Sequence, residues 1–231
     1  MISIPMPSQV KLLSTALLAC LLATPVYADE EGGGSADGMQ VKITRNLESV
    51  TINHDGREVV VQRNQDTKNV VDPGFAKTSR KCPPFCVQPI KLAEGVETLG
   101  TAEMLDYLKR KSDGDDTIEV IDSRGIDWVK RGTIPGTINI HYKKLSLKSG
   151  DPDEIVDFME ETFGVQRRGE FWDYSYAKTL VLFCNGMWCG QAPTNIKTLL
   201  RLGYPAEKLK WYRGGMQVWQ ILGLNTVKPT E

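Results

Sequence analysis

Two cysteines five positions apart carry the most reactive side-chain chemistry in this sequence. Cys184 directly follows the apolar run LVLF, and Cys189 closes the six-residue stretch CNGMWC. Cysteine reacts as its thiolate, and burial at the end of a strand disfavours that anion unless positive potential is supplied. No Lys or Arg lies between Cys184 and Thr194. We therefore expect backbone N–H groups of a tight loop, and the N-terminus of the helix that follows, to stabilise the sulfur anion.

A second cysteine pair lies about one hundred residues earlier, in the stretch CPPFC. Cys82 and Cys86 are predicted to form a structural disulfide, or else a dithiol that exchanges with Cys184 or with an outside partner. The spacings of the four cysteines match no usual zinc knuckle, so no metal site is predicted. No Cys-x-x-Cys-His and no other cofactor signature is present, so no cofactor is expected.

The amino-terminal residues have the composition of an export signal. Lys11 precedes an apolar stretch that acidic residues end at Asp29, and small residues before position 29 predict cleavage after Ala28. Residues 1–28 are therefore expected to be a signal peptide, with a periplasmic or secreted product. The apolar run is too short for a stable membrane span, and its continuation past Cys20 disfavours a lipoprotein. The acidic, glycine-rich residues 29–39 are expected to be a linker.

Residues 40–92 are predicted to form a small β-rich extension. Polar and apolar residues alternate on both sides of Asp55-Gly56, which is a strong signal for a β-hairpin within residues 40–64. His54 beside this turn is expected to be solvated. The proline-rich stretch with Cys82 and Cys86 follows as an irregular arm.

Residues 93–231 show the alternation of strands and helices that is typical of an α/β domain. Several predicted strands are continuously apolar, which indicates a mostly parallel sheet with helices on both faces. The predicted strands are 95–100, 117–122, 136–142, 178–183 and 208–215, and the predicted helices are 101–111, 126–132, 151–164, 192–204 and 216–224. Ligands of such sheets bind beyond the carboxyl ends of the strands, where Asp122, Arg124 and Cys184 are expected to meet.

Three stretches together resemble the rhodanese family of sulfurtransferases. The first is VIDSRG with GTIPGTINI, the second is the strand–cysteine–loop–helix around Cys184, and the third is WYRGGMQVW. They occur in the family's order and span roughly residues 93–225. The resemblance implies a single-domain sulfurtransferase in which Cys184 accepts a sulfur atom from thiosulfate or another sulfane-sulfur donor. The persulfide would then pass that sulfur to a thiol or protein acceptor.

The resemblance also implies roles for the neighbouring residues. Backbone amides of the loop would surround the sulfur, and Asp122 and Arg124 would support the loop. The residues that would supply these amides are Asn185, Gly186, Met187, Trp188 and Cys189. Cys189 stands where single-domain members often carry Arg, which removes a cation that would favour an anionic donor. Gly190 stands where a related phosphatase loop needs Arg, so phosphatase activity is not expected.

Two other functions fit the same residues. Cys189 is either a small apolar filler or a resolving thiol, and in the second case the chain would be a periplasmic thiol–disulfide protein that uses Cys184 with Cys189, or Cys82 with Cys86. A non-catalytic sulfur carrier or binding module is the third possibility. Lys and Arg total 28 against 29 Asp and Glu, a net charge of −1, so no nucleic-acid partner is expected.

Overall fold

The computed structural model describes residues 39–229, and its centre is a five-stranded parallel sheet in the order β3-β9-β8-β4-β5. The strands are β3 (Glu97–Leu99), β4 (Ile118–Asp122), β5 (Ile138–Asn139), β8 (Thr179–Phe183) and β9 (Leu209–Tyr212). Every neighbouring pair in this sheet is parallel, which confirms the predicted sheet type.

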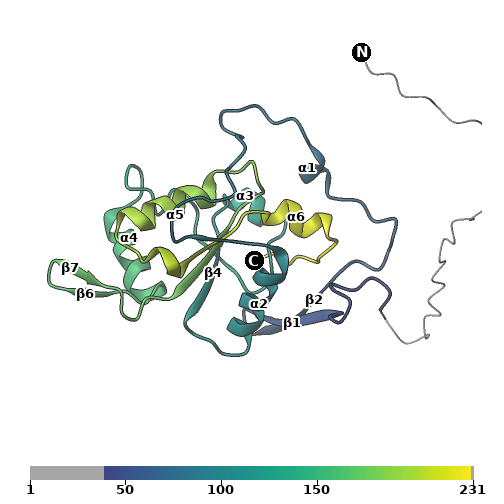
Figure 1. The fold of residues 1–231 in the computed structure, drawn as a ribbon, viewed down its shortest axis with the longest axis horizontal. Helices are drawn as coiled ribbons and strands as arrows, with labels where there is room; N and C mark the ends of the chain where they lie inside the picture. Colours follow the sequence, from purple (N-terminus) through teal and green to yellow (C-terminus); the bar gives the residue numbers. More distant parts are fainter. Residues whose placement is uncertain (1–38, 230–231) are drawn as a thin grey trace, which may run out of the picture. The chain divides into compact units, whose positions relative to one another are not determined.

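Helices cover both faces of the sheet, as predicted (Figure 1). They are α2 (Thr101–Ser112), α3 (Ile126–Val129), α4 (Pro152–Asp157), the π-helix η1 (Phe158–Thr162), α5 (Gln191–Arg201), the 3-10 helix η2 (Ala206–Lys208) and α6 (Gly215–Ile221). Side chains of β8 alternate between two buried clusters. Leu180 and Leu182 pack in the cluster that includes residues of η1 and α5, whereas Val181 and Phe183 pack in the cluster that includes residues of α2 and α6. A strand buried on both faces in this way accounts for the unbroken apolar run before Cys184.

The predicted amino-terminal hairpin is present and shares the core of the α/β domain. Strands β1 (Ser49–His54) and β2 (Arg57–Gln62) pair antiparallel around Asp55 and Gly56, both of which have positive φ. Val50, Ile52 and Val61 belong to the same buried cluster as α2, which lies beside β1 in Figure 1. The hairpin therefore covers part of the domain's own apolar surface.

The expectation that His54 is solvated is wrong. The residue is only 9 % exposed, and its Nδ1 accepts a hydrogen bond of 3.2 Å from the backbone amide of Gly136. The hairpin signal located the turn correctly, but it could not show that the end of β1 packs against a loop of the domain.

The secondary structure of residues 143–178 differs from the prediction of a single helix. The helix over 151–164 is instead α4 followed by η1, and a two-stranded hairpin follows, with β6 (Gln166–Arg168) and β7 (Phe171–Asp173). Trp172 and Tyr174 pack against the buried cluster on the α5 face, while Tyr176 is exposed.

A segment that we call the arm, residues 72–92, joins the hairpin to the domain. It begins with the short helix α1 (Pro73–Ala76) and continues without regular structure past Cys82 and Cys86. Within residues 39–229, no helix has the length and apolar character needed to cross a bilayer. The predicted signal peptide and nearly all of the predicted linker lie outside the described residues.

Candidate active site

Cys184 lies at the carboxyl edge of the central sheet, immediately after β8. The last residue of β8, Phe183, pairs with Asp122 at the end of β4, and its carbonyl accepts a 2.9 Å hydrogen bond from the amide of Ser123. The first residues beyond two adjacent strands are thus held together. The structure places Asp122, Arg124 and Cys184 at this shared edge, where parallel α/β sheets bind their ligands.

The Cys184 side chain is almost fully buried, with 2 % exposure. The backbone amides of Gly186 and Ala192 donate hydrogen bonds to its sulfur, while its thiol faces the Cys189 sulfur and lies 3.4 Å from the Cys189 carbonyl oxygen. Burial raises the pKa of the Cys184 thiol well above its ordinary value, and the neighbouring Cys189 raises it further. The resting group is therefore a protonated thiol that donates a hydrogen bond.

Cys189 has surroundings that favour its thiolate more than those of Cys184 do, and its sulfur lies 3.5 Å from Gln191 Oε1. The hydrogen bond from the Cys184 thiol lowers the pKa of Cys189, although burial opposes the shift. Amides of Gln191 and Asn185 donate to the Cys189 sulfur, and the positive charge of Arg124 lowers its pKa further.

The backbone donors are arranged differently from the expected ring of five amides around Cys184. Of the five, Gly186 donates to the Cys184 sulfur, Asn185 donates to the Cys189 sulfur, and the amide of Cys189 donates to the Gly186 carbonyl at 2.9 Å. The amide of Ala192, in the first turn of α5, is a donor that the sequence did not single out. The reason is that the loop interior holds two sulfur atoms, which divide the available donors between them.

The amino-terminal end of α6 fixes the back of the loop. Amides of Met216 and Gln217 donate to the carbonyls of Cys184 and Asn185 at 3.0 and 2.9 Å. Gly215 has a φ of +54°, and a Cβ at this position would lie 2.2 Å from the Cys184 carbonyl oxygen. The conformation and the close approach both require glycine. The closing stretch WYRGGMQVW therefore orients the two carbonyls away from the sulfurs.

Asp122 and Arg124 form a buried ion pair beside the loop. Arg124 Nη2 lies 2.6 Å from Asp122 Oδ2, Arg124 Nε lies 2.9 Å from Asp122 Oδ1, and both side chains are about 1 % exposed. The hydroxyl of Thr133 donates to the same carboxylate at 2.8 Å. Thr133 thus has a structural role in holding the Asp122 carboxylate.

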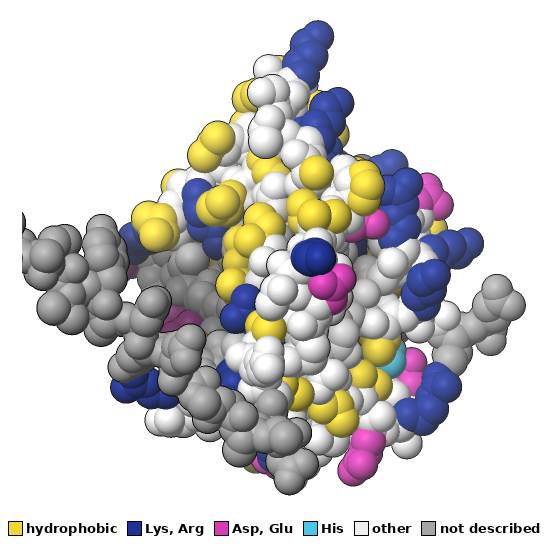
Figure 2. All heavy atoms as spheres, turned by 90° about the vertical axis from the view of Figure 1, so that its right-hand side faces the viewer, with side chains coloured by type: hydrophobic (Ala, Val, Ile, Leu, Met, Phe, Trp, Pro, Cys, Tyr) yellow, Lys and Arg dark blue, Asp and Glu magenta, His cyan; other side chains and the backbone are white. Residues whose placement is uncertain are grey.

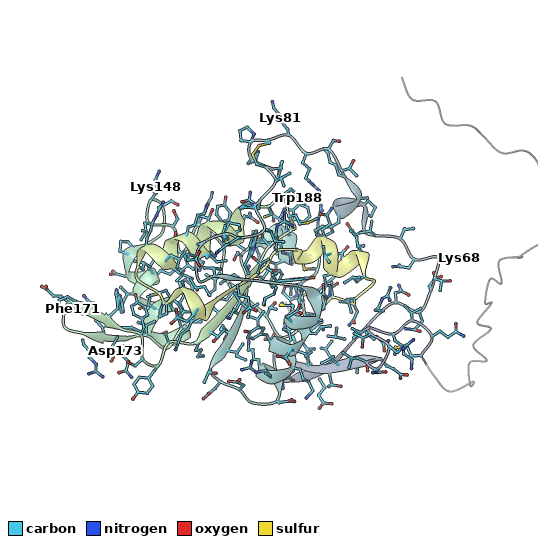
Figure 3. All side chains as sticks on the ribbon, viewed as in Figure 1. Lys68, Lys81, Lys148, Phe171, Asp173 and Trp188 are labelled. Carbon is cyan, nitrogen blue, oxygen red and sulfur yellow. A yellow bond between two sulfur atoms is a disulfide. The ribbon has the colours of Figure 1, made fainter. Side chains whose placement is uncertain are left out.

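The arm lies against the loop, a contact that no sequence pattern indicated. Cys82 and Cys86 are joined by a disulfide, and the Phe85 ring between them meets the Trp188 ring edge-on at a centroid distance of 5.6 Å. The amide of Gln88 donates to the Met187 carbonyl at 2.8 Å. In Figure 3, Trp188 lies beneath the arm, whose outer end carries Lys81.

Within residues 39–229, no group of three or more His, Cys, Asp or Glu side chains is arranged to hold a metal ion. The chemistry that these residues offer is that of two adjacent thiols in a loop of backbone donors.

The hydrogen bond between the two thiols predicts a measurable pH effect. In Cys184→Ala, the Cys189 thiolate loses its largest stabilising contact, so its pKa is expected to rise and its ionisation midpoint to move to higher pH. Cys184→Ser keeps a hydroxyl donor and is expected to shift the midpoint less. The ultraviolet absorbance of the thiolate, taken as the difference from a matching Cys189→Ala variant, measures this midpoint. Equal midpoints in Cys184→Ala and the parent protein would contradict the contact.

The structure thus defines an α/β protein with a parallel sheet and a cysteine-bearing loop between the central strand β8 and the next helix, α5. The rhodanese-like domain family matches residues 104–222, more than half of the chain. The chain therefore belongs to the rhodanese-like domain family, as the sequence resemblance predicted. The arm and the hairpin β1–β2 lie before the matched region.

Three solved structures illustrate the similarity. The rhodanese-like domain of an Anabaena protein is 17% identical with a TM-score of 0.37, and the match covers 59% of this chain and 81% of that one. A Rhodopseudomonas palustris protein of unknown function, described as a possible tyrosine phosphatase, is 21% identical with a TM-score of 0.38, covering 59% and 90%. The 3-mercaptopyruvate sulfotransferase SseA of Escherichia coli is 20% identical with a TM-score of 0.34, covering 52% and 41%. Comparison with curated proteins gave no match.

Proposed function

We propose that this protein is a sulfurtransferase in which Cys184 carries the transferred sulfur as a persulfide. The observation that carries the proposal is the position of Cys184 at the carboxyl end of β8, with the amides of Gly186 and Ala192 on its sulfur. These donors stabilise negative charge on the sulfur when the thiol ionises. Membership of the rhodanese-like family supports the same chemistry.

The reaction consists of two displacements at sulfur. The Cys184 thiolate attacks the outer sulfur of thiosulfate, the sulfur–sulfur bond of thiosulfate breaks, and sulfite leaves with the bonding electron pair. An acceptor thiolate then attacks the outer sulfur of the persulfide, takes that sulfur, and returns Cys184 as a thiolate. Each step conserves charge and needs no oxidant.

Cys189 is positioned to remove the proton from Cys184 before the first step. Its sulfur accepts the hydrogen bond of the Cys184 thiol, and its pKa is lowered while that of Cys184 is raised. Transfer of the shared proton to Cys189 is therefore uphill, and the attacking Cys184 thiolate forms as a minor species that the amides of Gly186 and Ala192 stabilise. An adjacent base that activates a nucleophile is a general feature of covalent catalysis. Cys189 would thus be the proton acceptor, a role that histidine has at other nucleophilic sites.

Mass spectrometry of the reduced protein after treatment with thiosulfate tests the proposal. We expect the mass of one added sulfur atom, assigned by peptide mapping to Cys184 and absent from Cys184→Ala. Cys189→Ala is the matched control: it should still gain the sulfur at Cys184, because the nucleophile and its backbone donors remain and a neighbour that raises the Cys184 pKa is gone. Turnover with cyanide as acceptor would distinguish an enzyme from a non-catalytic carrier. An unmodified Cys184 after treatment with thiosulfate and with polysulfide would refute sulfur transfer.

The contact between the two sulfurs favours a second candidate, a thiol–disulfide protein. Cys189 could attack the inner sulfur of a Cys184 persulfide, forming a Cys184–Cys189 disulfide and releasing hydrosulfide. The same mass experiment distinguishes the candidates, because this path ends with the loss of two hydrogens and depends on both cysteines. The sequence features of residues 1–28 also lead us to propose export, which amino-terminal sequencing of the secreted protein would test.

A further inference from the structure

Arg80 of the arm supplies a cation to a loop that has none of its own. Its guanidinium carbon lies 3.9 Å from the centroid of the Trp188 ring and 5.6 Å from that of the Phe85 ring. The six-residue loop Cys184–Cys189 contains no Lys or Arg. Arg80 thus brings a full positive charge onto the loop from a segment that precedes the family-matched region.

The guanidinium of Arg80 has an N–H donor that lacks an acceptor among the described residues. Its Nη2 donates to the Gly74 carbonyl at 2.7 Å, whereas its Nε is buried without a hydrogen-bond partner. Among the described residues, no carboxylate forms an ion pair with Arg80. Arginine has five N–H donors in a planar fork that suits oxyanions, and a buried donor without a partner is costly. The part of the chain that the structure describes therefore provides no acceptor for the Nε–H group of Arg80.

The surroundings of Arg80 are positive rather than negative. The arm carries Lys77, Arg80, Lys81 and Lys91 against a single acid, Asp72. Figure 2 shows hydrophobic side chains together with Lys and Arg side chains on the upper part of one face of the molecule. Such a surface attracts anions toward the loop.

We propose that Arg80 is a specificity-determining residue that binds the oxyanion group of the sulfur donor, so that the site takes small anionic donors such as thiosulfate. The inference rests on the proposed sulfur transfer to Cys184. In that reaction the sulfonate end of thiosulfate becomes sulfite, which leaves with an added electron pair. A guanidinium that binds this end would hold the donor and stabilise the leaving group. Arg80 of the arm would thus supply a cation to the loop, which has Cys189 at the position where other single-domain members often carry Arg.

Two sulfur electrophiles, one anionic and one neutral, test the inference. Thiosulfate is an anion, whereas methyl methanethiosulfonate has a comparable sulfur–sulfur bond without charge and transfers a methylthio group to a thiolate with loss of methanesulfinate. Second-order rates of modification at Cys184 would be measured for both by peptide mass. In Arg80→Gln, we expect the thiosulfate rate to fall about tenfold or more, as for loss of a charge-assisted hydrogen bond. The rate with the neutral reagent should fall much less, since that reagent carries no charge for Arg80 to bind before the reaction and presents only the charge that develops on the leaving sulfinate.

Matched variants distinguish the loss of donor binding by Arg80 from a change in the position of the arm. Arg167 of the β6–β7 hairpin stacks over the Trp172 ring at a distance of 6.0 Å, so Arg167→Gln should change neither rate. Phe85→Ala removes one of the two rings beside Arg80 but keeps the charge, and should lower the thiosulfate rate less than Arg80→Gln does. Arg80→Lys should recover part of the thiosulfate rate. Equal losses with both reagents in Arg80→Gln would assign Arg80 to arm position alone, and no loss with thiosulfate would exclude it from donor binding. No modification of Cys184 in the parent protein would instead refute the proposed function.

Discussion

Replacing Arg124 with Leu is expected to lower the free energy of unfolding by about 3–5 kcal/mol. The substitution leaves the Asp122 carboxylate buried at 0 % exposure without its cation, and only the Thr133 hydroxyl and the backbone amide of Arg124 remain as donors. An isolated charge at such a site is far more costly than the intact pair is stabilising. The loss should also raise the pKa of Cys189, because the charge of Arg124 lowers it in the parent protein.

Denaturant unfolding measures this stability effect. The double variant Asp122→Asn with Arg124→Leu should recover part of the loss, because the uncompensated charge is gone. The exposed pair Lys91–Glu94 provides the matched control, and Lys91→Leu should leave the free energy of unfolding nearly unchanged. A loss from Arg124→Leu as small as that of the control would show that water or other groups reach Asp122.

Replacing Gly215 with Ala is expected to reduce sulfur transfer to Cys184 by about a hundredfold or more, because small misplacements of reacting groups have effects of that order. The added Cβ would lie 2.2 Å from the Cys184 carbonyl oxygen and 2.9 Å from the Gly186 nitrogen. Both neighbours are backbone atoms, so the loop itself must move. The amide of Gly186, which donates to the Cys184 sulfur, would move with it.

Gly169 supplies a control for the strain of positive φ. Its φ of +64° is close to that of Gly215, but no atom lies within 4 Å of a Cβ built there. Gly169→Ala should therefore cost about 1–2 kcal/mol of stability and leave the rate of persulfide formation unchanged. Circular dichroism would confirm that Gly215→Ala is folded before its rate is compared. A Gly215→Ala rate equal to that of Gly169→Ala would contradict the role of α6 in holding the loop.

The fold could be predicted from the sequence where short-range physics determines it. The apolar run before Cys184 required a strand buried on both faces, and β8 is that strand. Asp55-Gly56 required a tight turn, and both residues have positive φ. Asp122 and Cys184 follow adjacent strands of a parallel sheet, so their meeting at one edge followed from topology.

The features that could not be predicted depend on contacts between distant segments. Arg80 contacts Trp188 although more than one hundred residues separate them in the sequence, and no sequence pattern links the two positions. Gln217 joins the arm and the loop through the Phe75 carbonyl and the Trp188 indole, although nothing in the sequence distinguishes this glutamine from others in a helix. The division of amides between two sulfurs depends on loop conformation, which residue types alone do not specify.

The position of hairpin β1–β2 limits how this protein could lose its parts. Val50, Ile52 and Val61 fill the same buried cluster as Met216 and Trp219, although they precede the family-matched region. Removing the hairpin from this chain would expose the apolar side chains that it covers to water. We therefore expect a chain that begins at the matched region to be less stable than the full chain, because the interior of this protein extends beyond the boundaries of the family domain.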